Sequence, residues 1–146
     1  YLMPGFHFKI SDILSSIGLA QLDRVDSKIE HVVEIYNRYN QALRDHKYLS
    51  VIEVSVDTGE VPLFFEILSP HVTELRAYLT ASGVATSHYH PALDRAAYLP
   101  TTTPEPNEFD NSTRFVDQTI VLPCGPDQPF ENVAEVIQIL RDWEPN

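Results

Sequence analysis

An apolar repeat with steps of mostly three and four residues occupies the first third of the sequence and constrains the fold more than any other feature. Its members are Ile13, Leu14, Ile17, Leu22, Val25, Ile29, Val32, Val33, Tyr36, Tyr39 and Leu43. This spacing predicts one apolar stripe on a helix or on a pair of consecutive helices. At about 1.5 Å per residue the stripe reaches roughly 50 Å, so we expect a spine shared with another domain or subunit.

The residues around this repeat predict where the helix starts and where it bends. Ser11 can accept a hydrogen bond from the free N–H groups of a first helical turn, and Asp12 complements the helix dipole there. Gly18 and the polar segment 23–27 are the predicted positions of a bend. Ser27 is suited to cap a second helical segment.

Shorter elements follow, and they set the fold class. We first expect a hairpin of strands 49–56 and 61–67 that turns near Gly59, followed by a helix from Ser69-Pro70 to Gly83. An extended segment 84–89 comes next, and then a surface segment 91–111 with a short helix from about 107. The chain ends with a strand 119–122 and a last helix from after Pro129 to about Trp143. Strands separated by helices predict an α+β fold, with a small, mainly antiparallel sheet and helices packed on one side. We expect a single domain over 1–146, with an interdomain or dimer helix region (1–45) and a small α+β part (46–146).

Charge and composition exclude several classes of protein. The net charge is −11 and the ten Lys and Arg residues form no cluster, which argues against a nucleic-acid partner and against adsorption to anionic membranes. No run of about 18 apolar residues predicts a membrane span. Cys124 is the only cysteine, so no internal disulfide is possible and a cytoplasmic location is expected. The first residue is Tyr1 rather than methionine, which suggests a fragment or a processed product.

Two segments carry a resemblance to a known family. Residues 5–13 read Gly-Phe-His-Phe-Lys-Ile-Ser-Asp-Ile and residues 17–22 read Ile-Gly-Leu-Ala-Gln-Leu. Residues 83–89 read Gly-Val-Ala-Thr-Ser-His-Tyr. Together they resemble the C-terminal portion of the DegT/DnrJ/EryC1/StrS aminotransferases, although the second segment is one residue shorter than the family's Gly-Ile-x-Thr-x-x-His-Tyr element.

The resemblance implies a fold-type-I aminotransferase that uses pyridoxal phosphate, works as a homodimer and aminates keto sugars attached to a nucleotide, with an amino acid such as glutamate as donor. It also implies a large N-terminal domain that carries the Schiff-base lysine. This chain has only Lys9, Lys28 and Lys47, and none lies in a motif that resembles that site. We therefore expect the missing large domain as a partner and no transamination by the isolated chain.

The first resembling segment supplies two candidate site residues. His7 stands where the family usually has an asparagine that reaches the cofactor phosphate of the neighbouring subunit, and an imidazole can donate one hydrogen bond to phosphate. Lys9 stands where the family often has arginine, and would hold a substrate phosphate as a point charge. The alternatives are a loop histidine near a subunit interface and a solvated lysine near a helix start.

The second segment supplies candidate sugar-binding residues. Alternation along an extended chain places His88 and His90 on one face and Tyr89 on the other. A further histidine of the family falls here on Leu93 or Asp94; if Asp94 takes that place, a donor becomes an acceptor. The alternative is that these residues only line a surface loop.

Other functions remain open at this point. The chain can be a non-catalytic interaction module whose long helix dimerises. A zinc-dependent hydrolase would use His88, His90 and Asp94, although no HExxH helix accompanies them. A nucleophilic pair of Cys124 with a histidine is weaker, since a lone cysteine after a strand is usually a small buried residue.

Overall fold

The computed structural model describes residues 10–88 and 109–145 of the chain. The elements in chain order are helix α1 (Asp12–Leu22), helix α2 (Val25–Leu43), strand β1 (Ser50–Val51), the 3-10 helix η1 (Val56–Thr58), strand β2 (Phe65–Leu68), helix α3 (Val72–Ala81), helix α4 (Asp110–Gln118), strand β3 (Thr119–Leu122) and helix α5 (Phe130–Arg141). The predicted α+β class is confirmed. Within the described ranges, no helix has the length and apolar character needed to cross a bilayer.

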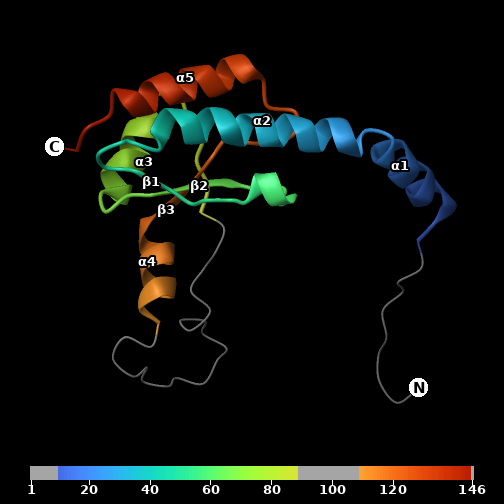
Figure 1. The fold of residues 1–146 in the computed structure, drawn as a ribbon, viewed down its shortest axis with the longest axis horizontal. Coiled ribbons are helices and arrows are strands. Elements are labelled where there is room, and N and C mark those ends of the chain that lie inside the picture. The colour runs from blue at the N-terminus through green and yellow to red at the C-terminus, as the bar shows by residue number, and fades with distance from the viewer. Residues whose placement is uncertain (1–9, 89–108, 146) are drawn as a thin grey trace.

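A three-stranded antiparallel sheet in the order β1-β2-β3 forms the base of the fold. In its register Phe65 lies opposite Leu122, and Ile67 lies opposite Ile120. Alternation puts these four side chains on one face, where they join the core with residues of α2, α3 and α5. Figure 1 shows α2 and α5 lying above the sheet, while α4 projects below it.

The second half of α2 supplies the centre of the core. The Tyr39 ring stacks on Phe65 with 4.7 Å between centroids, and Tyr36 meets the same ring edge-on at 5.6 Å. The buried Tyr39 hydroxyl donates to the carbonyl oxygen of Pro123 at 3.1 Å. Burial, together with the nearby Cys124, raises the pKa of Tyr39 far above its ordinary value, so the hydroxyl stays a donor. The predicted spine is therefore anchored to the sheet through its C-terminal half.

The spine is two helices rather than one, as the sequence allowed. Ser11 caps α1 as predicted, because its Oγ accepts from the N–H of Leu14 at 3.3 Å. The break falls at residues 23–24, inside the predicted polar segment, while Gly18 lies within α1. The prediction that Ser27 caps the second helix is wrong. Its hydroxyl lies inside α2 and donates to the carbonyl oxygen of Arg24 at 2.9 Å.

The predicted hairpin pairs correctly but its strands are much shorter than expected. After Val51 only Ile52 still bonds across, to the oxygen of Glu66 at 3.1 Å. The N–H of Val54 donates to the Tyr36 hydroxyl at 2.9 Å instead of to β2, so the chain turns toward α2 here. Residues 56–58 then form η1, and Gly59 ends it with the positive φ of 93° that the predicted turn required.

The later elements match the prediction with shifted ends. Helix α3 begins at Val72, two residues after the predicted Ser69-Pro70 start, and the Ser69 Oγ accepts from the N–H of His71 just before it. Gly83 ends α3 at a φ of 77°, as expected. Strand β3 has the predicted bounds, and α5 ends at Arg141, two residues early. The predicted surface segment lies mostly in 89–108, outside the described residues.

Candidate functional site

Of the six candidate residues named from the sequence, the described part of the chain contains His88. The other five, His7, Lys9, Tyr89, His90 and Asp94, fall in 1–9 and 89–108, so their roles stay predictions. His88 is exposed and follows Ser87 directly. Ser87 forms a two-way backbone bridge with Val121, with N–H to oxygen distances of 3.2 and 3.0 Å. This bridge shows that the expected segment is extended at Ser87 and pairs there with β3.

A cavity of about 430 Å³ opens beside this bridge. Its walls include Leu63, Ser87, Val121 and Cys124. A second groove, of about 310 Å³, lies between the start of α2 and the segment after η1. Both hollows share Leu63, Cys124 and Pro126 in their walls. The apolar residues of the second groove, Val25, Ile29, Val32, Val61, Pro62 and Leu63, bring together two parts of the chain that are distant in sequence, and Cys124 and Pro126 add a third.

Helix α1 precedes the part of α2 that lines this groove, and none of its side chains is buried by the described part of the chain. Helix α1 has no buried residue, and Ile13, Ile17 and Leu19 are 75%, 55% and 65% exposed. We call the exposed apolar side chains of α1 together with the groove walls the spine surface: Ile13, Leu14, Ile17, Leu19, Leu22, Val25, Ile29, Val32, Val61, Pro62 and Leu63. Exposed apolar side chains gathered in this number mark an interaction site.

The described lysines do not fit a covalent site for pyridoxal phosphate. Such an amine must be desolvated and held with a lowered pKa to attack an aldehyde. Lys28 instead donates from Nζ to Gln21 Oε1 at 2.7 Å on the exposed side of the spine. The Lys47 ammonium lies 4.7 Å from the centre of the Tyr48 ring, and its contact with Tyr48 raises its pKa above the ordinary value. Neither side chain has the environment that the cofactor needs.

The metal and thiol alternatives gain no support from the described residues. Across 10–88 and 109–145, no group of three His, Cys, Asp or Glu side chains is placed to hold a metal ion. His90 and Asp94 of the zinc hypothesis lie outside these ranges, so that hypothesis stays untested. Burial raises the pKa of the Cys124 thiol, and Glu66 adds to the rise, although the N–H of Phe65 at 3.2 Å opposes it. A nucleophilic cysteine needs the opposite shift.

Sequence reasoning missed the groove of the spine surface. Val61, Pro62 and Leu63 were expected to form a strand, in which alternate side chains point to opposite faces. They lie instead in the irregular segment before β2, with Val61 and Leu63 exposed beside α2. A Pro within a run of strand-forming residues was the available signal against a regular strand.

Comparisons with known proteins agree with this architecture. The family model for DegT/DnrJ/EryC1/StrS aminotransferases matches residues 1–141. The spore coat polysaccharide biosynthesis protein SpsC of Bacillus subtilis is 26% identical over 150 residues, covering 95% of this chain and 38% of SpsC. A UDP-4-amino-4,6-dideoxy-N-acetyl-beta-L-altrosamine transaminase of Campylobacter jejuni is 24% identical, covering 82% of this chain and 33% of the relative.

A solved structure, DesV of S. venezuelae, superposes with a TM-score of 0.84 at 21% identity, covering 92% of this chain and 37% of DesV. The chain thus spans little more than a third of the length of the proteins it matches. Enzymes of this family use pyridoxal phosphate. Because the family model matches nearly the whole sequence, the chain belongs to the DegT/DnrJ/EryC1/StrS aminotransferase family.

Proposed function

We propose that this chain is the C-terminal part of a pyridoxal-phosphate-dependent aminotransferase that acts on nucleotide-linked keto sugars. In the whole enzyme it docks on a large N-terminal domain, closes one side of the active site and builds part of a homodimer in the cytoplasm. The covalent attachment of the cofactor belongs to the large domain, and an amino acid supplies the amino group. Support for the substrate class comes from the family and from the named activity of the Campylobacter relative.

The observation that carries this proposal is the exposure of α1. Ile17 and Leu19 are two residues apart and so point to nearly opposite sides of the helix, yet both are more than half exposed. A helix that is apolar on several sides is normally enclosed by protein. Residues 23–88 and 109–145 do not enclose it, and related proteins are more than twice as long. The large domain is the partner that accounts for both facts.

Within this proposal the residues of the chain bind and orient rather than react. His88, with Tyr89, His90 and Asp94, contributes hydrogen-bonding groups to the sugar, and the Ser87–Val121 bridge fixes the start of that segment. His7 holds the cofactor phosphate and Lys9 a substrate phosphate. The cofactor supplies the electron sink for moving the amino group.

Cofactor labelling tests the division of labour. The chain is mixed with pyridoxal phosphate, reduced with borohydride and analysed by intact-protein mass spectrometry, in parallel with Lys28→Ala and Lys47→Ala variants. We expect no stoichiometric adduct, because neither described lysine is desolvated. A stoichiometric adduct that maps to Lys9 would overturn the proposal.

The reading frame ahead of Tyr1 supplies the second test. A lysine-bearing large domain encoded there, which binds this chain and restores amination of a nucleotide-linked keto sugar, is the expected result. Ile17→Asp should weaken that binding, whereas Ser16→Asp, an exposed polar position on the same helix, should not. Binding without any activity would favour the alternative of a non-catalytic interaction module, which the exposed α1 also suits. Stoichiometric zinc in the purified chain would favour the hydrolase.

A further inference from the structure

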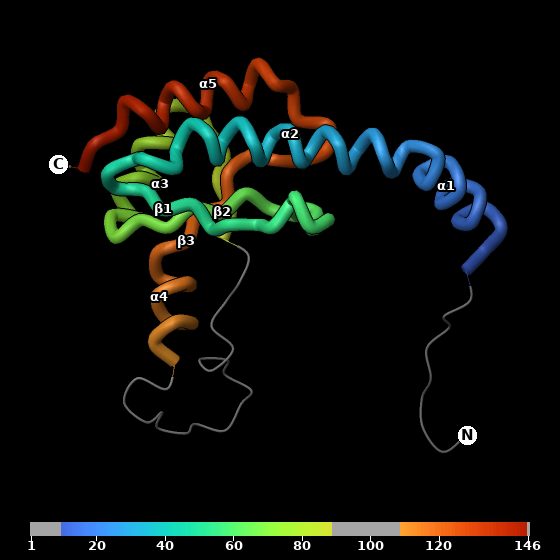
Figure 2. The backbone as a smooth tube through the Cα atoms, viewed as in Figure 1, coloured from blue at the N-terminus to red at the C-terminus, as the bar shows by residue number. Residues whose placement is uncertain are grey.

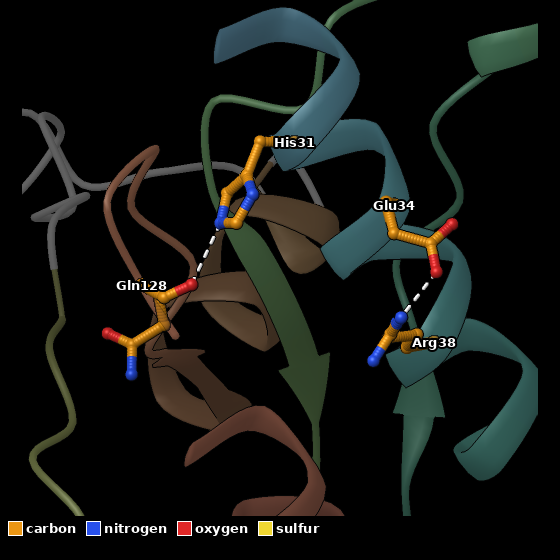
Figure 3. A network of polar contacts seen from close by, with 4 residues as sticks. All are labelled: His31, Glu34, Arg38 and Gln128. Carbon is orange, nitrogen blue, oxygen red and sulfur yellow. Dashed lines mark hydrogen bonds and ion pairs between the residues drawn. The ribbon is translucent and has the colours of Figure 1, made fainter. Parts of the chain in front are cut away.

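Two histidines tie α5 to the α2 side of the molecule, one at each end. Near the start of α5, Nε2 of His31 lies 2.8 Å from the backbone oxygen of Gln128 (Figure 3). Near its end, Nε2 of His46 lies 3.1 Å from the backbone oxygen of Leu140. His31 belongs to α2, and His46 follows it in the connection to β1. The two contacts therefore join α2 and the connection after it to the two ends of the α5 region.

The partners of each ring determine where its proton sits. A carbonyl oxygen only accepts, so both Nε2 atoms carry a hydrogen. The Nδ1 atom of His46 lies 3.2 Å from the backbone N–H of Tyr48, which only donates. His46 must therefore be neutral, with its lone pair on Nδ1. For His31, by contrast, the hydrogen bond formed with described residues uses Nε2 alone, and the ring stacks on Phe130 at 4.4 Å.

The two rings therefore respond differently to an added proton. A second N–H on His31 leaves its bond to Gln128 intact. A second N–H on His46 would point at the N–H of Tyr48, so the hydrogen bond is lost and two donors face each other. The His46 ring is also stacked 6.4 Å from Trp143, the 3% exposed side chain that follows α5. Tyr48 meets Trp143 edge-on at 6.2 Å, so the rings of His46, Tyr48 and Trp143 all contact one another and a shift of one disturbs the other two.

The charged groups on the elements around His46 balance one another. They are Arg44, Asp45 and Lys47 in its own connection, Arg141, Asp142 and Glu144 at and after the end of α5, and His71 before α3, behind Tyr48. Asp45 lies 3.6 Å from Arg44, and Asp142 accepts from Gln138. In the described part of the chain no carboxylate forms an ion pair with His46. An added proton on this ring therefore gains no paired anion in compensation.

We propose that His46 is a pH-sensitive latch: when neutral, its Nδ1 accepts from Tyr48 and holds Tyr48 beside Trp143, and when protonated it releases the N–H of Tyr48, while its Nε2–H still donates to Leu140. Histidine is the side chain that most often serves as a proton-operated switch, so acidification operates the latch. The released part is local, because the sheet and the start of α5 do not use this contact.

Amide hydrogen exchange on the 146-residue chain, compared at about pH 7.5 and pH 5.5, tests the latch. The protection factor of the Tyr48 amide should fall about tenfold in acid, whereas that of the Val133 amide near the start of α5 should not change. Trp143 is the only tryptophan, so its emission should shift to the red over the same range. Nitrogen NMR of the ring should show an unprotonated Nδ1 at neutral pH.

Three variants separate the latch from general acid sensitivity. His46→Asn keeps an acceptor for the N–H two residues later, as in an Asx turn, so Tyr48 should stay protected at both pH values. His46→Gln places its amide one methylene farther from the backbone, away from the position of Nδ1, and should leave Tyr48 poorly protected at both. His31→Gln should respond to acid as the parent chain does. Unchanged protection of Tyr48 in the parent, or the same loss in His46→Asn, would refute the latch; the nitrogen spectrum decides the matter if a variant fails to fold.

Discussion

Helix α1 and the second half of α2 carry the same apolar repeat but differ in burial. In α2, Ile35, Tyr36, Tyr39 and Leu43 are buried against the sheet and α5. In α1 no residue is buried, although the spacing of its apolar residues continues the same pattern. Periodicity thus specifies a helix and an apolar face, but burial depends on what else the chain supplies. The difference supports the proposal that α1 packs on a partner domain.

Two alanine substitutions, one in α2 and one in α1, test this difference most directly. Leu43→Ala should lower the free energy of unfolding by about 2–5 kcal/mol, because Leu43 is fully buried and its removal leaves a cavity. Ile17→Ala in α1 should change it by no more than about 0.5 kcal/mol, as for an exposed position. Urea unfolding followed by Trp143 emission measures both. Equal losses would mean that α1 is packed in the free chain.

A second substitution tests how α2 is fixed to the end of β3. Tyr39→Phe keeps the ring on Phe65 but leaves the Pro123 oxygen without its donor. We expect a loss of about 1–3 kcal/mol in the free energy of unfolding. Tyr36→Phe, whose hydroxyl accepts from the half-buried Val54, should cost less because water can replace the lost partner. The reverse order would contradict the central role given to Tyr39.

The cysteine between the core and the spine surface gives a pH-dependent test. Burial raises the pKa of the Cys124 thiol in the folded chain, so the fold favours the neutral form. This stabilisation is complete below the ordinary thiol pKa of about 8.5 and is lost as pH rises above it. At about pH 8.5 iodoacetamide should react roughly tenfold more slowly with the folded chain than with the urea-unfolded chain. A fast reaction in the folded state would indicate that Cys124 is a reactive thiolate.

The smallest expected effect concerns the cap of α1. Ser11→Ala removes the bond to the N–H of Leu14 and should weaken α1 by about 1 kcal/mol. Because α1 is unpacked in the described structure, global unfolding should be unaffected. Backbone chemical shifts over 12–22 report the fraying, and Ser15→Ala serves as the control because it removes no cap. A fall in global stability would show that α1 folds together with the core.

Local signals accounted for the parts of the fold that were predicted well. Ser11, Gly83 and the strand before Pro123 each act through neighbours in sequence, which a pattern can reveal. The short strands of the hairpin could not be predicted, because the Tyr36 hydroxyl that diverts the N–H of Val54 is 18 residues away. Ser27 was a suitable cap by type, but the break came earlier, at 23–24.

The candidate site was predicted in a different way. His88 and its neighbours came from resemblance, and the structure places only His88 among the described residues. The groove beside Cys124 could not be predicted from the sequence, because the sheet and the spine, rather than any local pattern, bring Val25, Leu63 and Cys124 together.

The pairing of α2 with α5 also bears on how the chain is made. The two helices lie side by side in Figure 2, yet His31 and Gln128 are 97 residues apart. A ribosome releases α2 well before it has synthesised the strand and helix that cover its apolar face. The growing polypeptide must therefore keep that face uncovered until α5 has been synthesised, a period in which nascent chains are prone to aggregate and chaperones bind them.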